Sequence, residues 1–280
     1  MTRIRVVTDS ACDLSADVAA EHGVGVVPLS IRFGDEEFVD GRDLTTEEFW
    51  ARCKASSVLP ETAAPSPGAF QEAFLDAAEQ GYDAVLSLSL SGGVSATFQS
   101  ATAAAEAVED RFEVRALDSR SMTMGLGLMV LEIAELAAAG ADLDALEARV
   151  YELIPRTSVY GVVENLEHLE KGGRIGGARA LMGSLLSIKP VVTLVDGVVA
   201  EESKQRTRGR SMQYLADKML GSPPLSRVAI THGAATDIDT FVALLTDLKS
   251  EHPLVVGQLG PVVGTHTGPG TIGVCMVTLD

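Results

Sequence analysis

The sequence predicts an α/β protein with a parallel sheet in its first half and a mixed sheet in its second half. Short apolar runs alternate with helical segments from residue 4 to residue 154, the pattern of a parallel sheet covered on both faces. In the second half, Asp196-Gly197 between two apolar runs is a strong hairpin signal. With 280 residues, 46% of them hydrophobic, the chain is long enough for two domains, which we place at residues 1–157 and 158–280.

The first half is expected to contain four strands separated by helices. The strands are expected at residues 4–7, 23–31, 85–90 and 112–117. Helices are expected after the cap Ser15, after Thr45 or Thr46, after Ser66, from about Thr97, across 125–140 and at 143–154. Turn-rich residues 34–43 predict an exposed hairpin, and the Pro-rich residues 58–68 predict a loop.

The second half combines hairpin and crossover units, which predicts a mixed sheet with helices mainly on one side. Strands are expected at 159–163, on both sides of Asp196-Gly197, and at 228–231, 254–256 and 271–278. Helices are expected to end near Leu186 and to cover 208–220 and 237–249. Residues 261–273 are expected to form a confined loop between two strands.

Polar turns follow three strands of the first half. They are Thr8-Asp9-Ser10, Ser89 to Ser95, and Asp118-Ser119. Ligands of parallel sheets bind beyond the carboxyl ends of the strands, where these turns converge, so we expect a polar pocket there. Ser91 and Ser95 precede the helix that begins near Thr97. A glycine turn at a helix start suits a carboxylate or phosphate, although a hydroxyl there is also suited to capping the helix.

Composition and motifs argue against several classes of protein. The net charge of −17, without a basic run, argues against nucleic-acid binding. No apolar run reaches membrane-spanning length, and three scattered cysteines indicate free thiols in a reducing compartment. The sequence has no Walker loop, no GxGxxG turn after a predicted strand, no HExxH motif and no CxxC pair. We therefore expect a cytoplasmic protein without a transmembrane segment, a metal site or a cofactor.

Three further features are candidates for chemistry. Gly93 to Thr97 is close to the GxSxG turn of serine hydrolases, which makes Ser95 a candidate nucleophile, although Thr97 replaces the last glycine. His266, in a loop rich in glycine and threonine, suits anion binding, proton transfer, or a bond to backbone within a turn. Arg174, in GGRIGG, suits a carboxylate or phosphate, with an interdomain ion pair as the alternative.

A basic cluster stands out in this acidic chain. It contains Lys204, Arg206, Arg208 and Arg210. The cluster fits either a solvated helix start or a surface for an anionic partner.

Together these motifs resemble the DegV family, whose members include the fatty-acid-binding subunit of bacterial fatty acid kinase. The resemblance spans essentially the whole chain. It rests on residues 8–14 (TDSACDL), 62–67 (TAAPSP), 91–101, 118–127, 169–175 (LEKGGRI), 188–190 (IKP) and 264–270 (GTHTGPG). The order and spread of these motifs make the set specific, although each one alone is weak.

The resemblance implies a two-domain DegV-type fold and a non-catalytic carrier with no cofactor. It places a long-chain fatty acid in a tunnel between the domains, with its carboxylate at Thr62, Ser95 and His266. An ATP-dependent kinase subunit would then phosphorylate that carboxylate. By the same resemblance, Arg174, Thr265 and Arg206 are candidates for the head-group or kinase-facing region. Supporting loops would contain Asp9, Ser10, Ser91, Thr97, Asp118 and Ser119.

The chain departs from the family pattern at two positions. Ala63 replaces the usual Ser after Thr62, and Ala96 replaces a glycine after Ser95. The second change affects how closely the backbone at residue 96 approaches a carboxylate, but it leaves the Ser95 hydroxyl in place. Two hypotheses follow from the sequence: a carrier that presents fatty acids, which we favour, and a serine esterase that uses Ser95 on acyl substrates.

Overall fold

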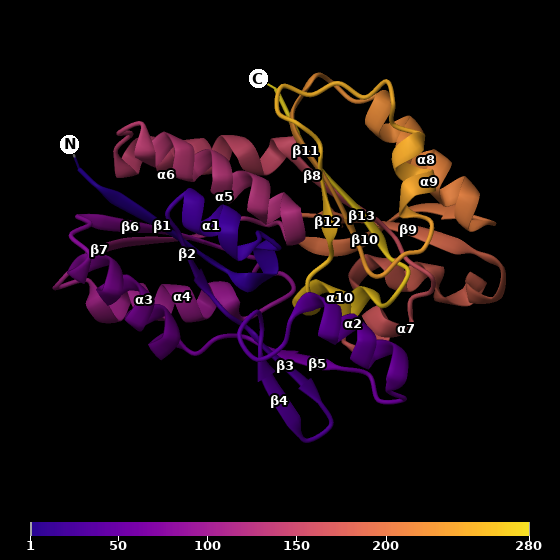
Figure 1. The fold of residues 1–280 in the computed structure, drawn as a ribbon, viewed down its shortest axis with the longest axis horizontal. Helices are drawn as coiled ribbons and strands as arrows, with labels where there is room; N and C mark the ends of the chain where they lie inside the picture. The colour runs from indigo at the N-terminus through magenta and orange to yellow at the C-terminus, as the bar shows by residue number, and fades with distance from the viewer. Residues whose placement is uncertain (1, 280) are drawn as a thin grey trace.

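The computed structural model describes residues 2–279, except for the side chains of residues 182–187. A four-stranded sheet in the order β2-β1-β6-β7 forms the centre of the first half (Figure 1). Its strands are β1 (Ile4–Asp9), β2 (Val24–Val27), β6 (Ala84–Ser89) and β7 (Glu113–Asp118). All of their pairings are parallel, as the sequence predicted.

Helices cover both faces of this sheet, which confirms the three-layer arrangement. On one face, α3 (Pro67–Glu79) and α4 (Thr97–Val108) pack against β1 and β6 around Phe70 and Phe74. On the other face lie α1 (Ala16–Glu21), α5 (Thr123–Ala138) and α6 (Leu143–Leu153) (Figure 1). Short 3₁₀ turns follow β1 (η1, Ser10–Cys12) and α6 (η2, Ile154–Arg156).

The second half is built on a mixed sheet in the order β10-β9-β8-β13-β11-β12. Its strands are β8 (Thr157–Val162), β9 (Lys189–Val195), β10 (Val198–Gln205), β11 (Leu225–His232), β12 (Val255–Gln258) and β13 (Ile272–Thr278). The pair β11–β12 is parallel and the other pairs are antiparallel. The predicted hairpin at Asp196-Gly197 joins β9 to β10, so the mixed sheet is confirmed.

The two faces of the mixed sheet have different neighbours. One face packs on α8 (Arg208–Leu220) and α9 (Ile238–Ala243). On the other face, Ala229, Cys275 and Val277 share one hydrophobic core with α5 and α6. That shared core joins the two halves, and the boundary between residues 157 and 158 stays a prediction.

A small antiparallel sheet, β4-β3-β5, corrects two predictions for the first half. The strand expected at 23–31 is divided into β2 and β3 (Ser30–Phe33) because Pro28 lacks the N–H needed to continue a ladder. β3 and β4 (Glu36–Val39) form the expected hairpin. The Pro-rich loop contains β5 (Glu61–Ala63), which pairs with β3, and it follows α2 (Thr46–Ala55).

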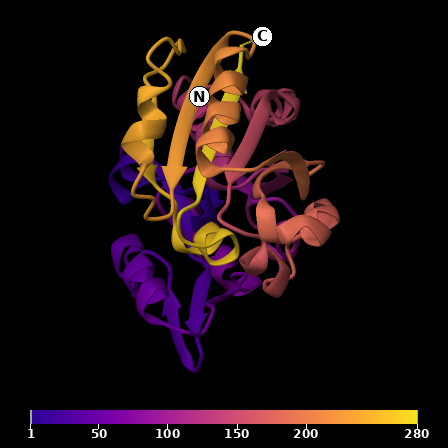
Figure 2. The ribbon, with the colours of Figure 1, turned by 90° about the vertical axis from the view of Figure 1, so that its right-hand side faces the viewer.

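Two predictions for the second half are also wrong. Residues 261–267, expected as loop, form α10 (Pro261–Thr267), with Pro261 at its first position, where a missing N–H costs nothing. α10 lies between the mixed sheet and the small sheet (Figure 2). The helix expected at 237–249 is only the short α9, followed by turns. Between β8 and β9 lie α7 (Glu167–Lys171) and η3 (Gly176–Ser187), where the short helix near Leu186 was expected.

Candidate functional site

A largely apolar cavity lies between the mixed sheet and the N-terminal half. It encloses about 810 Å³, including its opening. Its aliphatic walls are Leu90, Val94, Val159, Leu169, Val192, Leu194, Val199, Leu259, Val262 and Val263. None of the described residues that line it is an aspartate or a glutamate. The cavity is therefore suited to an elongated apolar ligand.

The mixed sheet forms one wall of the cavity, and two positions in that wall are glycines. Val192, Gly161, Gly273 and Thr231 are register partners on four adjacent strands, and all four line the cavity. We call Gly161 and Gly273 the glycine floor. Three strand spacings of about 4.8 Å make this row roughly 14 Å long. Because neither glycine has a side chain, the floor leaves space for a chain to cross the sheet.

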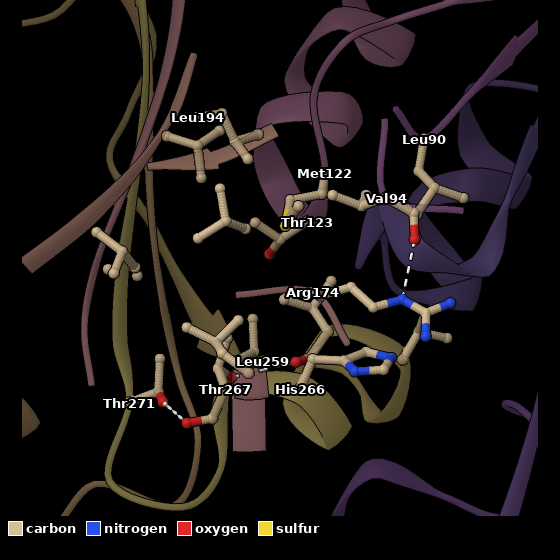
Figure 3. Close-up of a pocket in the computed structure, with 18 of the residues that line it drawn as sticks. Leu90, Val94, Met122, Thr123, Arg174, Leu194, Leu259, His266, Thr267 and Thr271 are labelled. Atoms are coloured by element: carbon tan, nitrogen blue, oxygen red, sulfur yellow. Dashed lines mark hydrogen bonds between the residues drawn. The ribbon is translucent and has the colours of Figure 1, made fainter. Parts of the chain in front are cut away.

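One end of the cavity is polar, and residues distant in sequence meet there. Thr62 lies on β5 and His266 on α10, and the Thr62 Oγ1 to His266 Nε2 distance is 2.9 Å. Ser95, before α4, and Arg174, between α7 and η3, line the same cavity. Figure 3 shows Arg174 beside His266, with the apolar side chains of Met122 and Leu194 farther along the cavity. Thr62, Ser95, Arg174 and His266 are thus brought to one cavity, as the sequence analysis expected.

Three contacts hold α10, and with it His266, in place. The Trp50 indole donates to the carbonyl of Leu259 over 2.9 Å, just before α10 begins. Gly264 packs against the same indole, since a Cβ at Gly264 would lie 2.7 Å from Trp50 Cζ2. On α7, His168 Nδ1 lies 3.0 Å from the carbonyl oxygen of Thr265 and donates to it.

Burial keeps His266 neutral. The pKa of His266 is lowered to about 4, mainly by burial and to a smaller extent by the nearby Arg174 and His168. Nδ1 is buried and has no acceptor among the described residues. An N–H without an acceptor is costly, so we assign the proton to Nε2, which donates to Thr62 Oγ1. The Thr62 hydroxyl proton is then available to a ligand.

Arg174 has spare hydrogen-bonding capacity. Its Nε donates to the carbonyl of Val94 over 3.1 Å (Figure 3) and its Nη1 to the carbonyl of Gly172 over 2.7 Å. Among the described residues no carboxylate pairs with its charge. A guanidinium has five N–H donors, so several remain for an anion. The interdomain ion pair considered from the sequence is not present in the described part of the chain.

Ser95 is not part of a catalytic triad in this arrangement. Its hydroxyl lies 2.9 Å from Thr97 Oγ1 and accepts a bond from the Thr97 N–H. A hydrolase nucleophile needs a histidine within hydrogen-bonding reach, and in the described structure His266 bonds to Thr62 instead. α4 begins without a side-chain cap, so its first N–H groups lie beside Ser95. The geometry favours anion binding over nucleophilic attack.

The three polar turns converge as predicted, and Ser95 of the second turn lines the cavity, while most of their other polar side chains bond to the backbone of the loops. Asp9 accepts from the N–H groups of Ala11 and Leu90, and Asp118 accepts from those of Gly92 and Arg120. The hydroxyls of Ser91 and Ser119 donate to the carbonyls of Gly197 and Ser121. These groups fix the loops at the strand ends, and Ser95 is the residue through which the turns reach the polar end of the cavity.

Three other predicted residues also lie off the cavity wall. Ser10 Oγ accepts from the Leu29 N–H and lines a separate groove. Thr265 is buried and donates to the carbonyl of Pro261. Arg206 is exposed at the end of the β9–β10 hairpin. A fourth predicted residue, Thr97, is likewise absent from the wall and hydrogen-bonds to Ser95.

Sequence reasoning did not identify the glycine floor, Thr123 or His168. Gly161 and Gly273 are glycines within apolar strands, a signal for close backbone approach that was available. Thr123 lines the cavity with a φ of 49°, which is rare for a β-branched residue, and no sequence pattern indicates it. His168 has no distinctive setting in the sequence, and its contact with α10 depends on tertiary packing.

Comparison with known proteins identifies the family. The family model described as an uncharacterised protein of the DegV family matches residues 3–279. The chain belongs to the DegV family. A DegV domain-containing protein of Listeria monocytogenes is 34% identical over 277 residues, covering 97% of each chain.

Two similar solved structures are DegV proteins named for fatty acid binding. One, from Thermus thermophilus, is described by its fatty acid binding; it is 33% identical with a TM-score of 0.91, covering 99% of this chain and 100% of the other. The second is DegV of Bacillus subtilis, named as a fatty acid binding protein. It is 30% identical with a TM-score of 0.87, and both chains are covered completely. The comparisons therefore agree with a binding protein rather than an enzyme.

Two searches of the described residues found nothing. No helix in that part of the chain combines the length and apolar character needed to span a membrane. No group of three or more His, Cys, Asp and Glu side chains there is arranged to hold a metal ion.

Proposed function

We propose that this protein binds one long-chain fatty acid, with the acyl chain in the cavity and the carboxylate at its polar end. The observation that carries the proposal is the make-up of the wall. Apolar residues surround the glycine floor, and the donors Thr62, Ser95, Arg174 and His266 meet at one end without an acidic neighbour in the wall. An amphipathic anion is the ligand class that satisfies both parts.

Burial of the acyl chain would supply most of the affinity. About ten buried methylenes at ~0.8 kcal/mol each contribute on the order of 8 kcal/mol before ordering costs. A neutral hydrogen bond to the head group adds about 1 kcal/mol, and a charge-assisted one somewhat more. The polar residues therefore set the orientation of the ligand and the requirement for an acid, while the tail sets how tightly it binds.

The carboxylate would replace the bond between Thr62 and His266. The Thr62 hydroxyl, the Ser95 hydroxyl and the neutral His266 Nε2–H are donors to its two oxygens. Arg174 adds the positive charge, so that the buried carboxylate is paired rather than isolated. The fatty acid binding named for the relatives from Thermus thermophilus and Bacillus subtilis supports the same assignment here.

We further propose that the protein is a carrier that presents its carboxylate to an ATP-dependent kinase subunit in the cytoplasm. No cofactor is needed for this role, because the phosphoryl group and the catalytic residues come from the partner. The exposed Arg206 is a candidate contact for that partner. Support comes from the family and from a hydroxyl at Ser95 that is placed to bind rather than to attack.

The experiment that tests the proposal is denaturing extraction of protein purified without detergent, followed by mass spectrometry. We expect about one acyl chain per protein. An empty protein that also takes up neither added oleate nor palmitate would contradict the proposal. The same preparation is treated with a fluorophosphonate probe, and a covalent adduct at Ser95 would favour the serine esterase instead.

A further inference from the structure

Six threonines line the cavity, and the hydroxyl of one of them has no partner. Five are engaged: Thr62 with His266, Thr123 with Asp13, Thr193 with the carbonyl of Val159, Thr267 with that of Val263, and Thr271 with those of Thr267 and Gly268. Thr231 Oγ1 is buried and makes no hydrogen bond in the described structure.

The unpartnered hydroxyl lies over the glycine floor. Thr231 is 1% exposed and is the register partner of Gly273 on the neighbouring strand. A Cβ built on Gly273 would lie 2.7 Å from Thr231 Oγ1. Register partners point to the same face of a sheet, and Gly273 faces the cavity, so the hydroxyl is on the ligand side. Thr231 also borders a second groove, and it forms part of the wall between the two spaces.

A buried hydroxyl without a hydrogen-bond partner destabilises the fold, because it has lost its bonds to water and gained none. Valine has nearly the same shape as threonine and would fill this position in an apolar wall without that cost. A hydrogen-bond partner for the Thr231 hydroxyl therefore has to come from a bound ligand. An unsubstituted methylene chain can neither donate nor accept a hydrogen bond, whereas a hydroxyl or keto oxygen on the chain can accept one from Thr231.

The position of Thr231 indicates where along the ligand that oxygen would lie. His266 is near the C-terminal end of α10. Gly233, two residues after Thr231, lies beside Gly268 at the C-terminal end of α10, so Thr231 is set back along the strand by roughly 7 Å. The oxygen that it binds would therefore lie along the acyl chain and not at the carboxylate.

We propose that the cavity prefers a fatty acid that carries a hydroxyl or keto oxygen along its chain, bound by Thr231 Oγ1. This inference rests on the proposed function, because it takes the acyl chain to cross the glycine floor. It makes Thr231 a specificity-determining residue for oxygenated fatty acids, whereas the donors at the polar end recognise only the acid.

The test compares the affinities of stearate and a series of positional hydroxystearate isomers for wild type, Thr231→Val and Thr231→Ser. In wild type, at least one isomer should bind about tenfold more tightly than stearate, the effect of one hydrogen bond. The preference should vanish in Thr231→Val and persist in Thr231→Ser, which keeps the hydroxyl. Thr231→Val should melt at or above the wild-type temperature, because it removes an unpartnered polar group.

Two results would overturn the inference. If stearate and every isomer bind wild type equally well, or if the preference survives in Thr231→Val, the Thr231 hydroxyl does not bind an oxygen of the ligand. Those outcomes leave the proposed function intact because stearate still binds. A protein that binds neither stearate nor any isomer would overturn the proposed function and this inference together.

Discussion

His266 combines two properties that suit a carboxylate-binding residue. Burial lowers its pKa to about 4, so at neutral pH the ring is an uncharged donor. An uncharged ring beside Arg174 avoids the repulsion that two adjacent cations would suffer in a buried site. In the proposed complex, Arg174 would supply the positive charge that pairs with the carboxylate, and His266 would fix the orientation of the carboxylate.

His266→Ala should separate fatty acid binding from presentation. Apolar burial dominates affinity, so we expect the variant to keep much of its lipid, with a loss of about tenfold or less for one hydrogen bond. Phosphorylation by the proposed kinase partner should fall by a larger factor, because in that proposal the imidazole donor helps to neutralise charge as the phosphoryl group arrives. Bound lipid is measured by mass spectrometry and acyl phosphate by its formation over time.

His252→Ala, at an exposed histidine away from the cavity, is the matched control and should behave as wild type. Thermal melting shows first whether the His266 variant is folded. If it is stable, loaded with lipid and phosphorylated at the wild-type rate, His266 has no functional role and its place in the site is wrong.

At the scale of single elements, β8 determines whether the floor is open. Gly161→Val should close it without harming the fold, because a Cβ there would meet Val192 Cγ2 at an ordinary distance of 3.5 Å. Valine suits a strand, and replacing glycine there gains roughly 0.5–1 kcal/mol. The added isopropyl group occupies the path of the acyl chain, so fatty acid uptake should fall at least tenfold while the melting temperature is kept or raised.

The control for that variant is Gly257→Val on β12. Gly257 is in the same register row, a Cβ there meets nothing within 4 Å, and the residue lies outside the cavity. We expect this variant to take up oleate as wild type does in a fluorescence competition assay. Equal uptake by Gly161→Val and Gly257→Val would show that the acyl chain does not cross the glycine floor.

The elements that the sequence predicted well are those with clear periodicity and caps. The Ser66 cap with Pro67, the Asp196-Gly197 turn and the parallel strands all appear as expected. α10 was not predicted because Gly264 lowers helix propensity. A glycine is needed at this position because the helix packs closely against Trp50, and that contact exists only in the folded chain. β5 was hidden among prolines, since a three-residue strand has too few residues to show a period.

The candidate site shows the same limit at longer range. Thr62 and His266 are 204 residues apart, and nothing in their spacing indicates that they share a hydrogen bond. Both residues, together with Ser95, were predicted from the resemblance to the DegV family. Contacts that depend on tertiary packing, such as that of His168 with the Thr265 carbonyl, and absences, such as the missing partner of Thr231, cannot be read from residue order.

At the scale of the whole molecule, three buried carboxyl groups in the N-terminal half set how stability depends on pH. Burial raises the pKa of Asp9 and of Asp13 to about 7 and the pKa of Asp40 to about 6. Backbone N–H groups that bond to Asp9 and a Ser10 bond to Asp40 act in the opposite direction, but burial is the larger effect. Each group therefore keeps its proton in the folded chain at pH values where an unfolded chain has lost it.

The sign of the effect follows from this difference. A carboxyl with a raised folded pKa contributes fully to stability below its unfolded pKa of 3.8, and that contribution is lost as the pH rises through the folded value. His266 acts oppositely between pH 6.5 and about 4, since its lowered pKa makes protonation favour the unfolded chain. A comparison of wild type with a single variant cancels the contribution of His266. For Asp40 the comparison reports mainly its own carboxyl, since the effect of Asp40 on the pKa of Asp9 and Asp13 is smaller than that of burial.

The stability of Asp40→Asn relative to wild type should therefore increase as the pH rises. Between about pH 4 and pH 6 the free energy of unfolding of wild type, minus that of the variant, should fall by up to about 1.4 kcal/mol per pH unit, and it should level off above this range. Urea unfolding at several pH values measures this difference, with Asp35→Asn, an exposed carboxylate in the neighbouring hairpin, as the control that should show no trend. A difference for Asp40→Asn that does not change with pH would mean that Asp40 ionises as readily inside the fold as in the unfolded chain, and that burial does not control its charge.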